Sequence, residues 1–81
     1  MTAARRYEPS RARARAIRQA REQSHMSERD LATAVGVSQA TVRAWEGAVR
    51  DPGPGMAWRI AVAARVPVSS LLMPVPGRAA A

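Results

Sequence analysis

Apolar side chains recur along this chain at intervals of three and four residues, the spacing of one face of an α-helix. Residues 11–23 carry a narrow stripe of this kind, so we expect a first helix there. Neither the alternation typical of a strand nor an internal repeat occurs in the sequence. The pattern therefore predicts an all-α protein. The stripe consists of Ala12, Ala16, Ile17, Ala20 and Ser24.

A second, short helix is predicted after Ser27. Ser27 and Asp30 have the spacing of a capping box, in which the hydroxyl and the carboxylate each accept a hydrogen bond from a backbone N–H. Leu31 and Val35 then share one face, and Gly36 is suited to end the helix in a tight turn.

The third helix is predicted over residues 39–46, with Ser38 as its cap. Val42 and Trp45 lie three residues apart and predict an inward face, which leaves polar and cationic side chains outside. Two short helices joined by a turn of about three residues containing glycine are typical of a helix-turn-helix.

The C-terminal half predicts two further helices. Pro54 suits the first turn of a helix that continues to about residue 66. Apolar residues around most of its circumference predict a buried helix with Trp58 in the core. Residues 68–73 predict a short fifth helix. The expected organisation is a basic arm at residues 1–9, a helix-turn-helix domain at residues 10–73 and a tail at residues 74–81.

Composition narrows the class of protein. The 81 residues allow one domain with a modest core, and without cysteine neither a disulfide nor a thiolate metal site supports it. Thirteen basic residues, all arginine, against six acidic ones give a formal net charge of +7, which favours nucleic acid as partner. The seven arginines between Arg5 and Arg21 fit phosphate contacts and a merely solvated helix face equally well.

Several other classes of protein are not expected. The sequence has no apolar run of the roughly 18 residues that span a bilayer, and no secretory signal. We expect a cytoplasmic, nucleoid-associated protein without cofactor, metal or small-molecule ligand. An enzyme is not expected, because His25 is the single histidine and because Glu28 and Asp30 face different ways on a short helix.

Four segments of the chain together match a known pattern: IRQARE (17–22), MSERDLATAVGVSQATVRAWEG (26–47), RDP (50–52) and RIAVAARVPVSSLL (59–72). In these segments the chain resembles the Cro/lambda-repressor-like helix-turn-helix domains, also called the XRE family. This resemblance implies a compact five-helix bundle in which the second helix crosses the DNA backbone and the third lies in the major groove.

The resemblance also assigns the interface. Gln39 is expected to pair with adenine and Arg43 with guanine, while the small side chains of Ala40 and Ala44 touch a thymine methyl or allow close approach. Ser27 and Ser38 also fit a role as caps, and Thr41 fits a structural role equally well. Phosphate contacts are expected from Ser27, Arg29, Ser38, Thr41 and Arg50, and from Arg5 and Arg6 in the arm.

Two departures from the family pattern stand beside one match. Arg21 and Glu46 match a pair that bridges the first and third helices, so we expect a structural ion pair. Glu28 stands where the family usually has a glutamine that contacts phosphate, which puts that contact in doubt. Gly47 precedes Ala48, whereas the family commonly has its glycine at the second of these positions.

The expected function is a sequence-specific, double-stranded-DNA-binding transcriptional regulator, a repressor of bacterial or phage Cro-like type. We expect a homodimer, at least on DNA, that joins through Leu72, Met73 and Val75. The alternative is a protein-interaction module of the same fold, such as an antitoxin or adaptor. Structured RNA is less favoured, because both tryptophans are predicted to be buried and Tyr7 is the only tyrosine.

Overall fold

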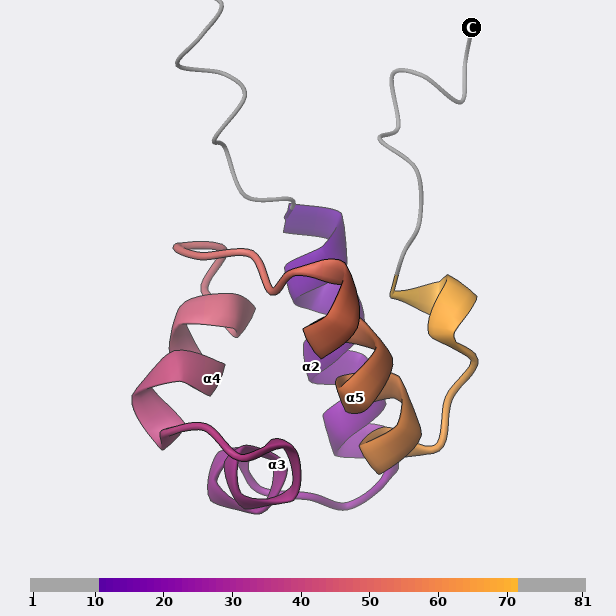
Figure 1. The fold of residues 1–81 in the computed structure, drawn as a ribbon, viewed down its shortest axis with the longest axis horizontal. Helices are drawn as coiled ribbons and strands as arrows, with labels where there is room; N and C mark the ends of the chain where they lie inside the picture. The colour runs from indigo at the N-terminus through magenta and orange to yellow at the C-terminus, as the bar shows by residue number, and fades with distance from the viewer. Residues whose placement is uncertain (1–10, 72–81) are drawn as a thin grey trace, which may run out of the picture.

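The computed structural model describes residues 11–71, which form four α-helices and one turn of 3-10 helix. In Figure 1, α5 crosses in front of α2, α4 lies on the left and α3 lies below. α3 contacts α4 and α5, and α2 contacts the same two helices, so all four share one core. The elements are α2 (Arg11–Gln23), α3 (Glu28–Val35), α4 (Gln39–Glu46), α5 (Pro54–Ala64) and η1 (Val68–Ser70).

The core takes its large side chains from all four α-helices and from Leu71, which follows η1. Burial of each such side chain contributes about 1.5–3 kcal/mol to the free energy of folding. Alanine supplies the other buried positions of α2 and α5. The fully buried large side chains are Ile17 of α2, Leu31 of α3, Val42 of α4, Ile60 of α5 and Leu71 after η1.

The predicted capping of α3 is confirmed. Ser27 Oγ accepts a hydrogen bond from Asp30 N at 2.9 Å, and Asp30 Oδ2 accepts one from Ser27 N at 2.9 Å. Gly36 ends the helix with φ 78°, a left-handed conformation that glycine adopts without steric penalty. Ser38 Oγ then accepts from Thr41 N at 3.2 Å and begins α4.

The expected fifth helix is wrong, because residues 68–70 form only a single 3-10 turn. Ser70 N donates to Pro67 O and Leu71 N donates to Val68 O, which is the i to i+3 pattern of a 3-10 helix. A piece of this length is typical of 3-10 helices, which rarely run beyond three or four residues. Leu71 still packs back into the core, as expected, whereas Leu72 lies outside the described residues.

The expected burial of Trp58 is also wrong, because this residue is 58% exposed. α5 buries a face made of small residues and Ile60, and Trp58 and Val62 lie one turn apart on a different face. The argument against RNA that assumed two buried tryptophans therefore fails for Trp58. On α2 the buried positions are Ala14, Ile17 and Ala20, so the expected stripe omitted Ala14.

The turn after α4 shows how the order Gly47–Ala48, which departs from the family pattern, is accommodated in the backbone. Gly47 has φ −90°, and the left-handed position is taken by Ala48, with φ 59°. His25 is left-handed too, with φ 58°. These two positions carry backbone strain that a glycine would relieve.

Polar contacts close the bundle at both ends. Arg13 Nε donates to Leu71 O at 2.7 Å, and Arg13 Nη1 pairs with Asp51 Oδ2 at 2.9 Å. Ser24 Oγ donates to Ala64 O at 2.5 Å, which joins the end of α2 to the end of α5. No helix within residues 11–71 is long and apolar enough to cross a membrane. The expected arm with Arg5 and Arg6, the expected tail, and Met73 and Val75 lie outside the described residues.

Candidate nucleic-acid interface

The two faces of α4 differ sharply in exposure. Val42 and Trp45 are buried in the core, as the spacing predicted. On the other side Ala40 and Arg43 are exposed, and Gln39 and Ala44 are partly buried. The four side chains expected to contact bases therefore keep access to solvent on one short helix. A helix of this width fits the major groove of B-form DNA.

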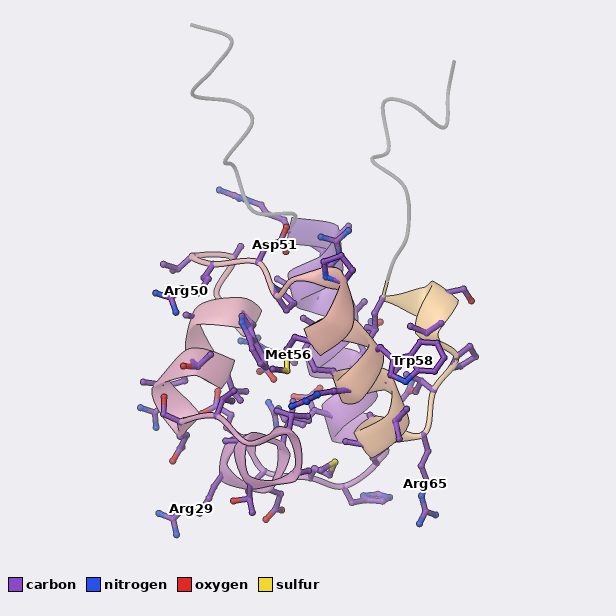
Figure 2. All side chains as sticks on the ribbon, viewed as in Figure 1. Arg29, Arg50, Asp51, Met56, Trp58 and Arg65 are labelled. Carbon is purple, nitrogen blue, oxygen red and sulfur yellow. The ribbon has the colours of Figure 1, made fainter. Side chains whose placement is uncertain are left out.

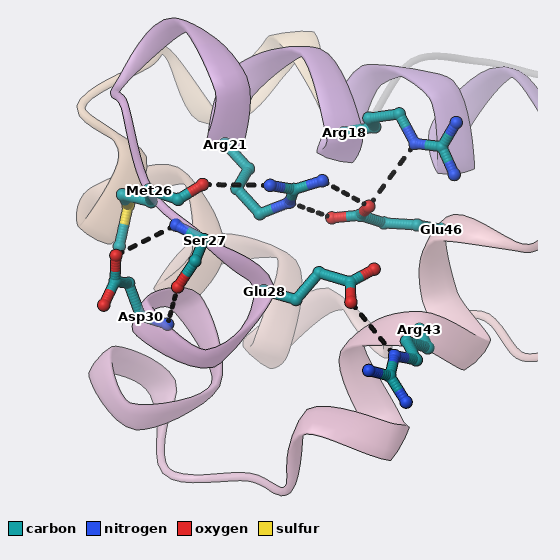
Figure 3. Close-up of polar contacts among 8 residues, drawn as sticks. All are labelled: Arg18, Arg21, Met26, Ser27, Glu28, Asp30, Arg43 and Glu46. Atoms are coloured by element: carbon teal, nitrogen blue, oxygen red, sulfur yellow. Dashed lines mark hydrogen bonds and ion pairs between the residues drawn. The ribbon is translucent and has the colours of Figure 1, made fainter.

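An ion-pair network fixes the position of α4. Arg21 Nε contacts Glu46 Oε2 at 2.7 Å and Arg21 Nη2 contacts Glu46 Oε1 at 3.0 Å, so the pair is bidentate (Figure 3). The remaining nitrogen, Nη1, donates to Met26 O at 2.9 Å. The hydrogen bond to Glu46 raises the pKa of Arg21. One guanidinium thus connects α2, the end of α4 and the segment that leads into α3.

Burial makes this pair important. The carboxylate side chain of Glu46 is only 1% exposed and that of Arg21 is 13% exposed. Arg18 approaches the same carboxylate with Nε at 3.4 Å, but its side chain is 54% exposed. A buried carboxylate needs close partners to offset the water it has lost, and Arg21 supplies most of that compensation.

Arg43 is not isolated on the outer face of α4. Its Nε donates to Glu28 Oε1 at 3.0 Å, which joins the first residue of α3 to the middle of α4 (Figure 3). The pKa of Glu28 is lowered, chiefly by this hydrogen bond and to a smaller extent by Gln39. Arg43 and Gln39, the two polar side chains among the four expected to contact bases, therefore lie near Glu28. The sequence singled out Glu28 only as a departure and gave no sign of these contacts.

Two of the three residues whose hydroxyl groups were expected to contact DNA phosphates, Ser27 and Ser38, are helix caps, and the third, Thr41, contacts the second cap. Ser27 and Ser38 accept from the backbone N–H groups described above, and Ser38 Oγ lies 3.0 Å from Thr41 Oγ1. A hydroxyl that accepts a cap hydrogen bond still has its own proton to donate. Capping and phosphate binding are therefore compatible at Ser27. Between Ser38 and Thr41, one hydroxyl proton is used in their mutual contact and the other stays available to donate.

Arginines lie beyond both ends of α4. In Figure 2, Arg50 extends from the left of the molecule above α4 and Arg29 below it, away from Trp58 and Arg65 on the right. Arg29 and Arg50 are both exposed. Both arginines expected to contact phosphates are therefore available to an anionic partner.

A cleft beside the end of α4 contains basic residues that the sequence grouped only in the arginine run between Arg5 and Arg21. It has a volume of about 390 Å³ and lies between α2 and the turn at Gly47 and Ala48. Arg11, Arg15 and Arg18 line it, next to Glu46. The alternating arginines of residues 11–18 were visible in the sequence, but only the packing of α2 against α4 brings them to the edge of this surface.

Most acidic side chains among residues 11–71 already have a hydrogen-bond or ion-pair partner within the protein. Glu28, Asp30, Glu46 and Asp51 each have an arginine or a backbone partner. Within residues 11–71 no group of three or more metal-ligating side chains is close enough to hold an ion. The positive charge of the outer surface is thus only partly neutralised, and the site is suited to bind an anionic surface.

Comparison with known proteins places the chain in a family. A family profile described as helix-turn-helix matches residues 17–71. The chain therefore belongs to this helix-turn-helix family, and the expected membership is confirmed.

Among the solved structures that match the chain, one illustrates the shared fold. It is a hypothetical transcription factor, NHTF, from Neisseria, with 24% identity and a TM-score of 0.72 over 86% of this chain and 80% of that chain. At this identity the likeness concerns the fold alone. A search of curated proteins found no match.

Proposed function

We propose that this protein is a sequence-specific, double-stranded-DNA-binding transcriptional regulator that places α4 in the major groove. The observation that carries the proposal is the pairing of a solvated α4 face, centred on Arg43, with a buried network at Glu46 that fixes the helix. Arg43 reads guanine and Gln39 reads adenine, while Ala40 and Ala44 allow close approach or touch a thymine methyl.

The backbone contacts in this proposal come from around α4. Arg29 and Arg50 bind phosphates, Ser27, Ser38 and Thr41 donate hydroxyl protons, and the arginines of the α2 cleft extend the same surface. Arg5 and Arg6 add contacts from the arm, as basic segments near a recognition helix do. The family membership and the shared fold of NHTF support this assignment.

We further infer a repressor of bacterial or phage Cro-like type, which acts by occupying an operator in the cytoplasm. A single eight-residue recognition helix buries little surface, which favours a homodimer on a pseudo-palindrome with half-sites about one helical turn apart. Leu72, Met73 and Val75 are the proposed dimer contacts. Light scattering with and without operator DNA measures the assembly directly, and a monomer in both conditions contradicts this part of the proposal.

The decisive experiment is in vitro selection from random duplexes at moderate salt, followed by affinity measurements over a range of salt concentrations. The expected result is an enriched, two-fold symmetric site. Log affinity should fall with log salt with a slope of about −0.9 for each phosphate contact. No enrichment, together with no duplex binding at low salt, contradicts the proposed function.

A protein-interaction module is the second candidate, and the exposed apolar residues of α5 favour it. Trp58 is 58% and Val62 63% exposed, and both line a groove of about 700 Å³ beside residues 33–36. Exposed apolar side chains that share a groove are typical of protein-binding surfaces. This candidate is supported if the chain does not bind duplex DNA but binds a protein partner, and if the W58A variant binds that partner more weakly than wild type does. Selection with structured RNA in parallel tests whether Trp58 serves instead as a stacking platform.

A further inference from the structure

Glu28 and Arg43 meet at the outer edge of the helix-turn-helix, where α3 begins beside α4. The side chain of Arg43 is 64% exposed and that of Glu28 is 26% exposed, so the pair lies at the surface. An acid at this place opposes DNA phosphates by charge. Its contact with Arg43, rather than with DNA, indicates a different role for Glu28.

The pair uses only one nitrogen of the guanidinium. Arginine offers N–H donors on Nε and on both Nη atoms. Among the described residues Glu28 is the hydrogen-bond acceptor of Arg43, and it takes the Nε proton alone. Figure 3 marks the contact at Nε and marks none from either Nη atom to Glu28. The guanidinium of Arg43 is thus held at Nε, while its two Nη groups, which can pair with guanine O6 and N7, stay available.

Holding Nε changes the energetics of recognition. A free arginine side chain samples many rotamers, and ordering it on DNA opposes binding. A carboxylate that holds Nε beforehand removes part of this loss, and it restricts the directions in which the Nη groups reach. The lowered pKa of Glu28 keeps its carboxylate ionised at neutral pH, so the contact persists under the conditions of binding.

We propose that Glu28 is a specificity-determining positioning residue that holds Arg43 through Nε so that the two Nη groups read one guanine. Its negative charge also weakens binding to duplexes that lack this guanine, because there no base contact offsets the repulsion between the carboxylate and the phosphates. This inference rests on the proposed function, since it requires α4 to enter the major groove.

The test is a double-mutant cycle on the full chain. Each protein is titrated with the duplex obtained by selection and with a series of duplexes, in each of which one guanine of the half-site is replaced. The four proteins are wild type, E28A, R43A and E28A/R43A. E28Q keeps an acceptor oxygen without the charge. E22Q is the matched control, because Glu22 is an exposed acid on α2. Thermal unfolding by circular dichroism verifies that every variant is folded.

Discrimination is the ratio of affinities for the two duplexes at the position where R43A loses it. We expect E28A to lower this ratio about five- to tenfold, part of the discrimination that a bidentate contact provides, and to bind the substituted duplex at least as tightly as wild type does. E28Q should retain more discrimination than E28A. E22Q should leave the ratio unchanged. In the R43A background, E28A should have no further effect on the ratio, because Glu28 acts through Arg43.

Two results overturn the inference while the proposed function stands. One is an E28A protein that discriminates as wild type does, and the other is an equal loss of discrimination with and without Arg43. A wild-type chain that binds no duplex overturns the proposed function, and the inference with it, so the two failures are distinguishable.

Discussion

Arg21 offers the sharpest test of how this fold holds α4. The change Arg21→Ala removes both hydrogen bonds to Glu46 and the one to Met26 O. It leaves behind a carboxylate that is 1% exposed in the wild-type structure. Breaking a buried ion pair from one side destabilises proteins by about 3–5 kcal/mol, because the remaining charge is desolvated and unpaired.

Arg18 places the expected value at the lower end of that range. Its Nε already lies 3.4 Å from Glu46 Oε1 and can move closer, so we expect a loss of about 3 kcal/mol in the free energy of unfolding. A chain of this length has about 4–12 kcal/mol in total. At about 4–8 °C per kcal/mol, the melting temperature should fall by about 12–24 °C.

The assay is urea and thermal denaturation followed by circular dichroism, with two matched variants. R18A removes an exposed partner of the same carboxylate and should change stability by less than about 1 kcal/mol. R21M/E46L replaces the pair with apolar side chains and should recover most of the loss. The reasoning is refuted if R21A lies within about 1 kcal/mol of wild type, or if R18A is as destabilising as R21A.

Three further predictions concern the turn, the interface and the titration of Glu28. A48G should stabilise the protein by about 0.5–1 kcal/mol because Ala48 is left-handed, whereas G36A should destabilise it by more than about 1 kcal/mol. Denaturation that finds A48G less stable than wild type, or G36A more stable, contradicts this. R43A should lose about 1–3 kcal/mol on the preferred site and relax base choice, whereas R50A should weaken all duplexes alike and reduce the salt slope by about 1; identical effects contradict the assigned roles. The pKa of Glu28, followed by NMR, should lie below its ordinary value in wild type and rise in R43A. Because the folded-state pKa is the lower one, the stabilisation by this pair should be present above the ordinary pKa and lost as pH falls through the lowered value.

Local features were predictable because their causes lie within a few residues of one another. The spacing of Ser27 and Asp30 predicts a capping box, and Val42 and Trp45 define the inner face of α4 by their position on one helix. The limits of α2 and α4 agree with the expected ranges 11–23 and 39–46. Gly36 had only to be recognised as the residue that tolerates a left-handed end.

Other features were decided by contacts between distant parts of the chain. α5 is apolar on nearly every side, so its sequence does not specify which face is buried, and the packing of α2 and α3 leaves Trp58 outside. Glu28 and Arg43 are 15 residues apart and meet only because α3 and α4 cross at a particular angle. Arg13 reaches Leu71 over 58 residues.

The sequence by itself therefore determined the four α-helices, the caps of α3 and α4 and the outward character of α4, since each depends on the short-range geometry of a single helix. Only the tertiary structure decided how these helices face one another. It thereby buried Glu46 against Arg21 and placed Glu28 against Arg43. The reason is physical: a helical period identifies which side chains share a face, whereas the neighbour of that face is chosen by the packing of the whole core.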